Sequence, residues 1–173
     1  GCTEGDLGST CAVGYFGYAY YQENAGELQA VRVDGVEPNA ETVDAATYPL
    51  ARPLFMYTAP SVLAEKPHVA DFIAYYLNNV NTVISDVGYF PAPAAALEGA
   101  AGAIGAAAGF AGCEAPVAAP PEEPDAPMSE LGLPIIDPLD ASGEDIAIAG
   151  SSTVFPLSVA LITQWEDEGG TRY

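Results

Sequence analysis

Three hydroxyl-bearing residues in a row, Ser151, Ser152 and Thr153, stand between a short and a longer apolar stretch near the end of this 173-residue sequence. This order predicts a strand, a small turn and the first turn of a helix. The first N–H groups of a helix lack intrahelical partners and lie at the positive end of its dipole, so they favour an anion. The hydroxyls would add neutral, directed donors for a dehydrated oxyanion. The other interpretation is a plain helix N-cap, a position where Ser and Thr are common, and both interpretations stand at this point.

Residues that could catalyse a reaction are few. The single histidine, His68, lies near the start of an apolar helical pattern, and no nucleophile or carboxylate stands at a recognised catalytic spacing. The stretch "GYFGYAYY" lacks the glycine spacing of a nucleotide-binding loop. We therefore expect no enzymatic activity, no metal and no cofactor, and we expect His68 to be a helix-end residue.

The charge balance limits the partners. Four Lys and Arg stand against 24 Asp and Glu, which gives a formal net charge of −20. Such a field repels nucleic acid phosphates and anionic lipid headgroups, so nucleic acid is excluded as a partner. The acidity itself is read as a solvated surface that keeps the protein in solution, rather than as an acidic binding site.

The three cysteines, Cys2, Cys11 and Cys113, are too few and too irregularly spaced for a zinc site or a disulfide scaffold. Cys2 and Cys11 could close a short loop in an oxidising compartment, which would leave Cys113 unpaired. No signal-peptide pattern opens the sequence. The run at 99–112 is too short and too rich in Gly and Ala for a membrane span, so we expect a soluble chain.

Residues 12–90 carry the clearest elements. The stretch "AVGYFGYAYY" is strand-like. A helix is predicted over "HVADFIAYYLNNV" because apolar residues recur at helical spacing and Pro67 falls in the first turn. These apolar residues are Val69, Phe72, Ile73, Tyr76, Leu77 and Val80. We expect the face that they form to lie in a core.

Composition changes at residue 91. From 91 to 144 the sequence is dominated by Ala, Gly, Pro and acidic residues, with few large side chains to bury, so a long, flexible, semi-extended Ala/Pro-rich linker is predicted. Order returns after it. A strand is predicted around Ile146 and Ile148, and a helix follows that Gly169 and Gly170 end. The apolar face of that helix is predicted from Val154, Leu157, Leu161, Ile162 and Trp165.

Two parts of the sequence resemble one family. "GSSTVFPL", after a short strand, resembles the beginning of the phosphate-binding proteins of ABC phosphate transporters, the PstS family. "GYFGYAYY", "YPLARPLF" and "VISDVGYFP" resemble the closing third of the same family. The family's end therefore precedes the family's beginning in this chain. Either the chain comes from a longer protein with tandem domains of this kind, or it is a permuted, shortened domain.

The resemblance implies a fold and a division of the chain. The fold is an α/β, periplasmic-binding-protein-like (type II) lobe, incomplete or permuted, with a parallel strand at 146–149. The C-terminal-like segment is 1–90, the linker 91–144 and the N-terminal-like segment 145–173. In the family, these two parts lie largely in the same one of two lobes.

The resemblance also implies a function. This is a non-catalytic solute-binding protein, periplasmic or extracellular or held at a membrane, that binds inorganic phosphate and serves an ABC transporter permease. Ser151, Ser152, Thr153, Val154 and Phe155 would supply phosphate-oxygen donors through hydroxyl and backbone N–H groups.

Much of the family's phosphate cage has no counterpart in the sequence. The proton-accepting Asp and the Arg-x-x-x-Ser-Gly-Thr loop are missing, so a second copy or another chain would have to complete the fold. Arg52 does not stand in that context and is expected to form a surface or hinge ion pair. The alternative function is a structural or assembly module that descends from this fold and has lost ligand binding.

Overall fold

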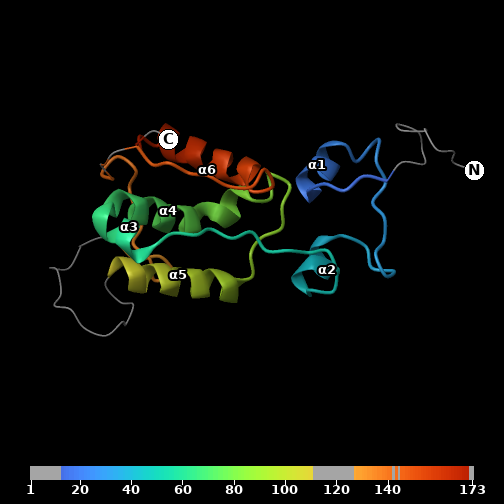
Figure 1. Ribbon diagram of the computed structural model, residues 1–173, viewed down its shortest axis with the longest axis horizontal. Coiled ribbons are helices and arrows are strands. Elements are labelled where there is room, and N and C mark those ends of the chain that lie inside the picture. The colour runs from blue at the N-terminus through green and yellow to red at the C-terminus, as the bar shows by residue number, and fades with distance from the viewer. Residues whose placement is uncertain (1–12, 111–126, 142, 144, 172–173) are drawn as a thin grey trace, which may run out of the picture.

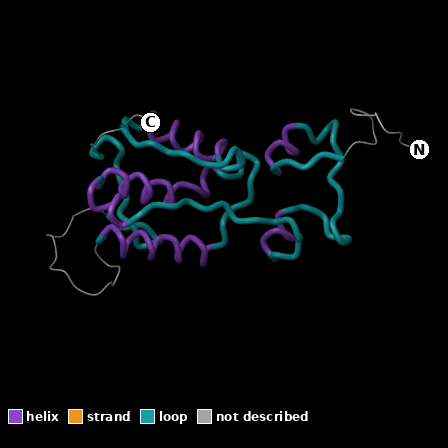
Figure 2. Tube along the Cα trace, viewed as in Figure 1, coloured by secondary structure: helices purple, strands orange, loops and turns teal. Residues whose placement is uncertain are grey.

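The computed structural model describes residues 13–110, 127–141, 143 and 145–171. The described residues form helices joined by long irregular segments, as Figures 1 and 2 show. The helices are α1 (Tyr18–Glu23), α2 (Ala40–Asp44), α3 (Pro60–Glu65), α4 (Pro67–Val83), α5 (Ala94–Ala108) and α6 (Phe155–Asp167). The four helices α3 to α6 pack together, whereas α1 and α2 lie beyond one end of this bundle (Figure 1). No helix in the described ranges is long and apolar enough to cross a membrane.

Helix α4 is the centre of the bundle and contacts α3, α5 and α6. The helix predicted from the apolar spacing is confirmed, and Pro67 stands at its N-terminus, where a missing N–H costs nothing. Four residues of the predicted face are buried: Phe72, Ile73, Tyr76 and Val80. The other two, Val69 and Leu77, are partly buried and pack against the buried residues. The sequence pattern therefore predicted both the helix and the side that it buries.

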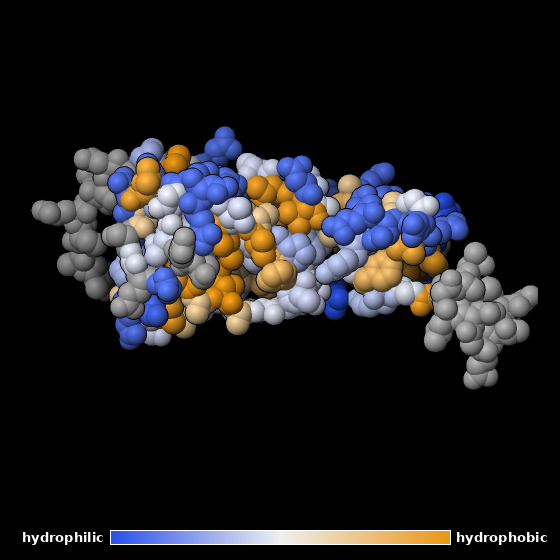
Figure 3. Space-filling model, turned by 90° about the horizontal axis from the view of Figure 1, so that it is seen from above, coloured by the Kyte–Doolittle hydropathy of each residue, from blue (hydrophilic) through white to orange (hydrophobic). Residues whose placement is uncertain are grey.

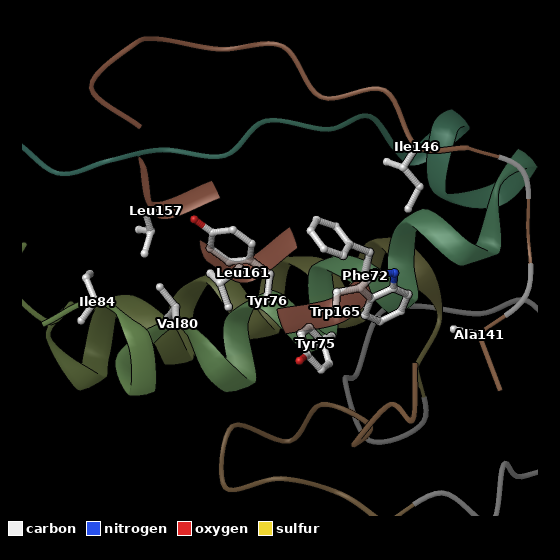
Figure 4. Close-up of a cluster of buried hydrophobic side chains, with 10 residues drawn as sticks. All are labelled: Phe72, Tyr75, Tyr76, Val80, Ile84, Ala141, Ile146, Leu157, Leu161 and Trp165. Atoms are coloured by element: carbon white, nitrogen blue, oxygen red, sulfur yellow. The ribbon is translucent and has the colours of Figure 1, made fainter. Parts of the chain in front are cut away.

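Helix α6 closes the core over α4, as predicted for the helix that follows residue 154. Leu157, Leu161 and Trp165 are buried against Phe72 and Tyr75. In Figure 4 the Trp165 indole lies between these two rings, and its edge-on contacts have ring centroids 5.5 Å from Phe72 and 5.0 Å from Tyr75. Beyond the helix, Gly169 adopts a left-handed φ of 95°, a conformation that favours glycine. The two family-like segments thus share one hydrophobic core.

The prediction of a semi-extended linker was wrong for residues 94–108, which form α5. Alanine is the best helix former, and the run "AAALEGAAGAIGAAA" contains mainly Ala and Gly with no interior proline. Small side chains also let α5 lie close to α4, where Ala101 is fully buried with Leu133 from the following loop. This part of the predicted linker therefore belongs to the core. Residues 111–126 lie outside the described ranges.

The strands that the α/β prediction required are absent from the described residues, where the β-type pairings are the isolated bridges Val33 with Val36 and Met128 with Pro134. The strand predicted over 12–21 was wrong from residue 18 onward, where α1 begins. The strand predicted at 146–149 was also wrong, because among the described residues this segment has no neighbouring strand to pair with. The sequence has the apolar content of a strand here, but a strand also requires a partner.

Candidate functional site

The predicted phosphate turn lies at the N-terminus of α6, as the sequence indicated. Ser151 and Ser152 are exposed, and Thr153 and Val154 are half-buried. The Phe155 side chain is 66% exposed although it begins the helix. The structure therefore brings the five predicted residues together in one turn that solvent can reach.

Hydrogen bonds inside the turn already engage several of its N–H groups. The N–H groups of Val154 and Phe155 donate to the Ser151 carbonyl oxygen at 2.9 and 3.2 Å. The Thr153 N–H donates to Ser151 Oγ at 3.2 Å. A phosphate oxygen at this turn would have to share or replace these three bonds.

The N-cap interpretation is supported for Ser151, although Ser151 does not directly precede α6. Val154 occupies the N-cap position of α6, and no side chain there accepts a hydrogen bond from the helix. Three residues earlier, Ser151 makes the hydrogen bonds of a cap, because its carbonyl oxygen accepts from the Val154 and Phe155 N–H groups and its Oγ accepts from the Thr153 N–H.

Tyr89 connects the turn to the first family-like segment. Its hydroxyl donates to the Thr153 carbonyl oxygen at 2.6 Å. Burial raises the pKa of Tyr89 above its ordinary value, so the phenol keeps its proton and remains a donor at neutral pH. A Cβ on Gly17 would stand 3.8 Å from Thr153 Cγ2 and 3.9 Å from the Tyr89 hydroxyl, so the start of α1 also adjoins the turn.

Gly88 holds α1 against this site. It adopts a φ of +82°, and a Cβ there would approach Ala19 Cα to 3.2 Å. Next to this close approach, the rings of Tyr18 and Phe90 contact each other at a tilt of 40°, with centroids 4.6 Å apart. We call the contact between Gly17, Gly88, Tyr89 and the turn 151–155 the junction.

The sequence analysis missed Gly88 and Tyr89 as members of the site. A signal was present, because "VGYF" occurs twice, at 13–16 and again at 87–90. Gly17 directly follows the first copy, and Tyr89 lies within the second copy. The two residues meet at the junction.

Within the described ranges, no basic side chain has a recorded bond with the turn. The Arg32 side chain forms an ion pair with Glu37, with 3.0 Å between Arg32 Nη2 and Glu37 Oε2. Arg52 is exposed and donates to the Tyr15 hydroxyl at 2.8 Å, so the prediction that it forms an ion pair was wrong. The donors that the described residues offer at the turn are therefore neutral hydroxyl and N–H groups.

An open cavity of about 750 Å³ lies elsewhere and does not suit phosphate. Its lining includes Asp71, Asp137, Asp140 and Glu168. Carboxylates repel a phosphate dianion, and burial that raises the pKa of Asp71 does not remove the other charges. No group of residues suited to a metal occurs within the described ranges.

His68 is buried in the first turn of α4, which confirms it as a helix-end residue. Its ring lies against Gly143, where an added Cβ would fall closer than contact distance to the imidazole. The residue is therefore part of the packing between α4 and the segment that leads to α6. The predicted loop between Cys2 and Cys11, and Cys113, lie outside the described residues.

Removing the Tyr89 hydroxyl tests whether the junction is formed. We expect Tyr89→Phe to lower the free energy of unfolding by about 0.5–1.5 kcal/mol, the usual net value of one hydrogen bond. Urea denaturation followed by circular dichroism measures this. Tyr20→Phe is the matched control, because no described residue forms a hydrogen bond with the Tyr20 hydroxyl, and equal losses in the two variants would contradict the contact.

The comparisons with known proteins point to one group of relatives. No family model matches the chain, and no solved structure matches it. Protein SphX of Synechocystis is 39% identical over 90 residues, which are 49% of this chain and 27% of the relative. Protein SphX of Synechococcus elongatus is 39% identical over 94 residues, 51% of this chain and 28% of that protein. The phosphate-binding protein PstS of Staphylococcus aureus is 31% identical over 86 residues, 47% of this chain and 26% of that protein.

These likenesses have a defined extent. They cover about half of this chain and support a relationship to phosphate-binding proteins of the PstS kind. The chain spans only about a quarter of the length of the curated relatives that it matches.

Proposed function

We propose that this chain is part of an extracytoplasmic solute-binding protein that binds inorganic phosphate and delivers it to an ABC transporter permease. The observation that carries the proposal is the likeness, over 86 residues, to proteins named as phosphate-binding. The Tyr89 contact with Thr153 supports it, because this contact joins the first family-like segment to the proposed phosphate turn. No catalytic step is part of the proposal.

In this proposal, the turn holds one face of the phosphate. The hydroxyls of Ser151, Ser152 and Thr153 donate to phosphate oxygens, with the N–H groups of Val154 and Phe155 beside them at the positive end of the α6 dipole. Directed donors replace part of the hydration shell that the anion loses. Because the N–H groups of the turn also donate to Ser151, each would be a bifurcated donor, shared between a Ser151 oxygen and a phosphate oxygen.

The other face of the phosphate must be bound by groups outside this set. A dehydrated anion binds tightly only when most of its oxygens are satisfied at once. Arg32 and Arg52 have other partners. The remaining donors are proposed to come from a further part of a longer chain or from a second chain. We accordingly expect weak binding by these 173 residues alone.

The reversed order of the two segments fits a shared lobe. Phe72 and Tyr75 from the first segment pack with Leu161 and Trp165 from the second. This core supports an arrangement in which the end of one domain and the start of another, or the two ends of a permuted domain, build one lobe. The three-part division at residues 90 and 144 remains a prediction, and α5 now adds a packed element to its middle part.

One observation favours the alternative function, a structural or assembly module. Three N–H groups of the turn are already engaged within it, and α6 uses Leu157, Leu161 and Trp165 for packing. In that case the second segment completes a core and holds no ligand.

Calorimetric titration of the intact chain with phosphate, and with sulfate as the control anion, tests the proposal. We expect weak, phosphate-selective binding with a dissociation constant on the order of 1 mM or above. The triple variant Ser151→Ala, Ser152→Ala and Thr153→Ala should weaken it at least tenfold, because the neutral donors are lost. Thr163→Ala, an exposed hydroxyl farther along α6, is the matched control and should leave binding unchanged.

The outcomes separate the two functions. Unchanged affinity in the triple variant would exclude the turn as the binding site, and equal affinity for sulfate would contradict the proposed selectivity. Absence of binding to the intact chain would favour the structural module. That module predicts an assembly in solution, which analytical ultracentrifugation measures.

A further inference from the structure

Residues 52–58, which read "RPLFMYT", connect two parts of the molecule. We call residues 13–51, which include α1 and α2, the arm. The segment leads from the arm to α3 and the rest of the helical bundle, as Figure 1 shows. Because the chain is linear, this segment is the covalent link between the arm and the bundle.

The segment is exposed along its whole length, and its backbone is unpaired. Every residue from 52 to 58 is exposed, and the aromatic side chains Phe55 and Tyr57 are 64% and 86% exposed. Figure 3 shows apolar surface across the middle of one face of the molecule. Within the described structure, the backbone N–H and C=O groups of the segment take part in no recorded hydrogen bond. Both the side chains and the main chain can therefore be bound by another protein.

These features suit the substrate of an endopeptidase. Such an enzyme holds the chain around the cut bond in an extended form and binds its N–H and C=O groups as those of an added strand. A helix has to open locally before it can be cut, whereas an unpaired segment does not. Phe55 and Tyr57 are large apolar side chains of the kind that fill an apolar S1 pocket, which holds the side chain before the cut bond.

Other exposed parts of the described chain fit less well. Residues 24–39 and 145–150 contain no aromatic residue, and Ile146 is anchored in the core. Tyr15 and Phe16 are exposed, but the carbonyl oxygen of the next residue already accepts hydrogen bonds from α1. The segment 52–58 thus combines an unpaired backbone with aromatic side chains.

The arm does not share the hydrophobic core of the bundle. All residues of the three hydrophobic clusters lie between 63 and 165. Neither α1 nor α2 packs against another described helix. The recorded contacts of the arm with the bundle gather at the junction, where Ala19 approaches Gly88 and Tyr18 contacts Phe90. Contacts this few do not offset the translational and rotational freedom that a separate fragment gains.

We propose that residues 52–58 are a processing site, where an endopeptidase with an apolar S1 pocket cuts the chain after Phe55 or Tyr57 and releases the arm from the bundle. Water adds across one amide bond, so that the residue before the cut gains a carboxylate and the residue after it gains an amino group. Release of the arm takes Gly17 away from Thr153 and exposes the turn 151–155 on that side. The inference goes beyond the proposed function and does not depend on phosphate binding.

Limited digestion of the intact chain with chymotrypsin, which cuts after large aromatic and apolar residues, tests the site. We expect the first cut after Phe55 or Tyr57, as identified by intact mass spectrometry. A cut after Tyr20, which is 48% exposed, should be at least tenfold slower, because the Tyr20 N–H is paired in the first turn of α1. Residues 1–12 and 111–126 contain no aromatic residue and offer no competing aromatic position.

Separation of the two fragments tests the release. Size-exclusion chromatography under native conditions should separate the arm from a fragment that begins at residue 56 or 58. The single tryptophan, Trp165, is fully buried in the bundle. Its emission spectrum in the larger fragment should therefore remain that of the intact chain.

Proline substitutions test the position of the cut. In the double variant Met56→Pro and Thr58→Pro, each bond to be cut precedes a proline, which has no N–H and a fixed φ. The residue before a proline favours an extended backbone, so the segment keeps its conformation. We expect the first cut to slow at least tenfold. The double variant Met56→Ala and Thr58→Ala is the matched control and should be cut as the parent chain is.

Four outcomes would overturn the inference. These are a first cut at any other bond, resistance of the segment in the intact chain, equal rates in the proline variant and its alanine control, and an arm that stays bound to the bundle after the cut.

Discussion

Replacing Trp165 with alanine should lower the free energy of unfolding by about 3–5 kcal/mol, at the upper end of the range for core truncations. The side chain is fully buried and makes edge-on contacts with the rings of Phe72 and Tyr75. Its indole N–H also donates to the Thr171 carbonyl oxygen at 3.2 Å, which holds the chain after α6 in place. The variant loses the apolar burial and the hydrogen bond and gains a large cavity.

Guanidinium denaturation followed by circular dichroism at 222 nm measures the loss, since the sequence has a single tryptophan and its fluorescence disappears with the substitution. Val159→Ala on the exposed side of α6 is the control and should change the stability by less than about 1 kcal/mol. If Trp165→Ala does not fold, Trp165→Phe should retain the fold with an intermediate loss. A loss for Trp165→Ala no larger than that of Val159→Ala would contradict the described core.

Replacing Gly88 with alanine should lower the free energy of unfolding by about 2–4 kcal/mol, from left-handed backbone strain and overpacking together. Gly88 has a φ of +82°, and an added Cβ would stand 3.2 Å from Ala19 Cα. A backbone atom cannot move aside as the end of a flexible side chain can. The clash should therefore push α1 away from residues 84–90 and separate Tyr89 from Thr153.

Gly35→Ala separates the cost of the left-handed conformation from the cost of overpacking. Gly35 has nearly the same backbone conformation, with a φ of +80°, but no atom lies within 4 Å of the position of its Cβ. We expect Gly35→Ala to lose only about 1–2 kcal/mol, the cost of the left-handed conformation. Thermal denaturation and amide chemical shifts of residues 151–155 measure both variants. Equal losses, or unchanged shifts in Gly88→Ala, would contradict the close approach of α1 to the junction.

The sequence predicted the parts of the fold that depend on local periodicity. The spacing of Phe72, Ile73, Tyr76 and Val80 defines a single helical face, and α4 buries that face. The end of α6 followed from glycines, of which Gly169 adopts a conformation that favours this residue. Both signals act within a few residues and need no knowledge of the rest of the chain.

The parts that depend on distant neighbours could not be predicted in this way. Ala101 belongs to an Ala-rich run that looks like a linker, and its burial depends on the Leu133 side chain and the adjacent surface of α4. Ile146 and Ile148 have strand propensity, but without a neighbouring strand they remain irregular.

At the candidate site, the positions of Ser151, Ser152 and Thr153 in one turn followed from the sequence. The way in which Ser151 closes the turn, and the Tyr89 hydroxyl on the Thr153 carbonyl, depend on tertiary packing.

The shared core of the two segments also has a consequence for synthesis on the ribosome. The hydrogen bond from Tyr75 to Glu168 joins residues 93 positions apart, and Trp165 packs on the same ring. Until α6 leaves the ribosomal tunnel, α4 has no partner for this side and exposes Phe72 and Tyr75 to solvent. Closing a loop of this length costs conformational entropy, so the contacts between α4 and α6 form late in folding. The nascent chain therefore passes through an interval in which α4 exposes apolar side chains of the kind that chaperones bind, and the emergence of α6 ends that interval.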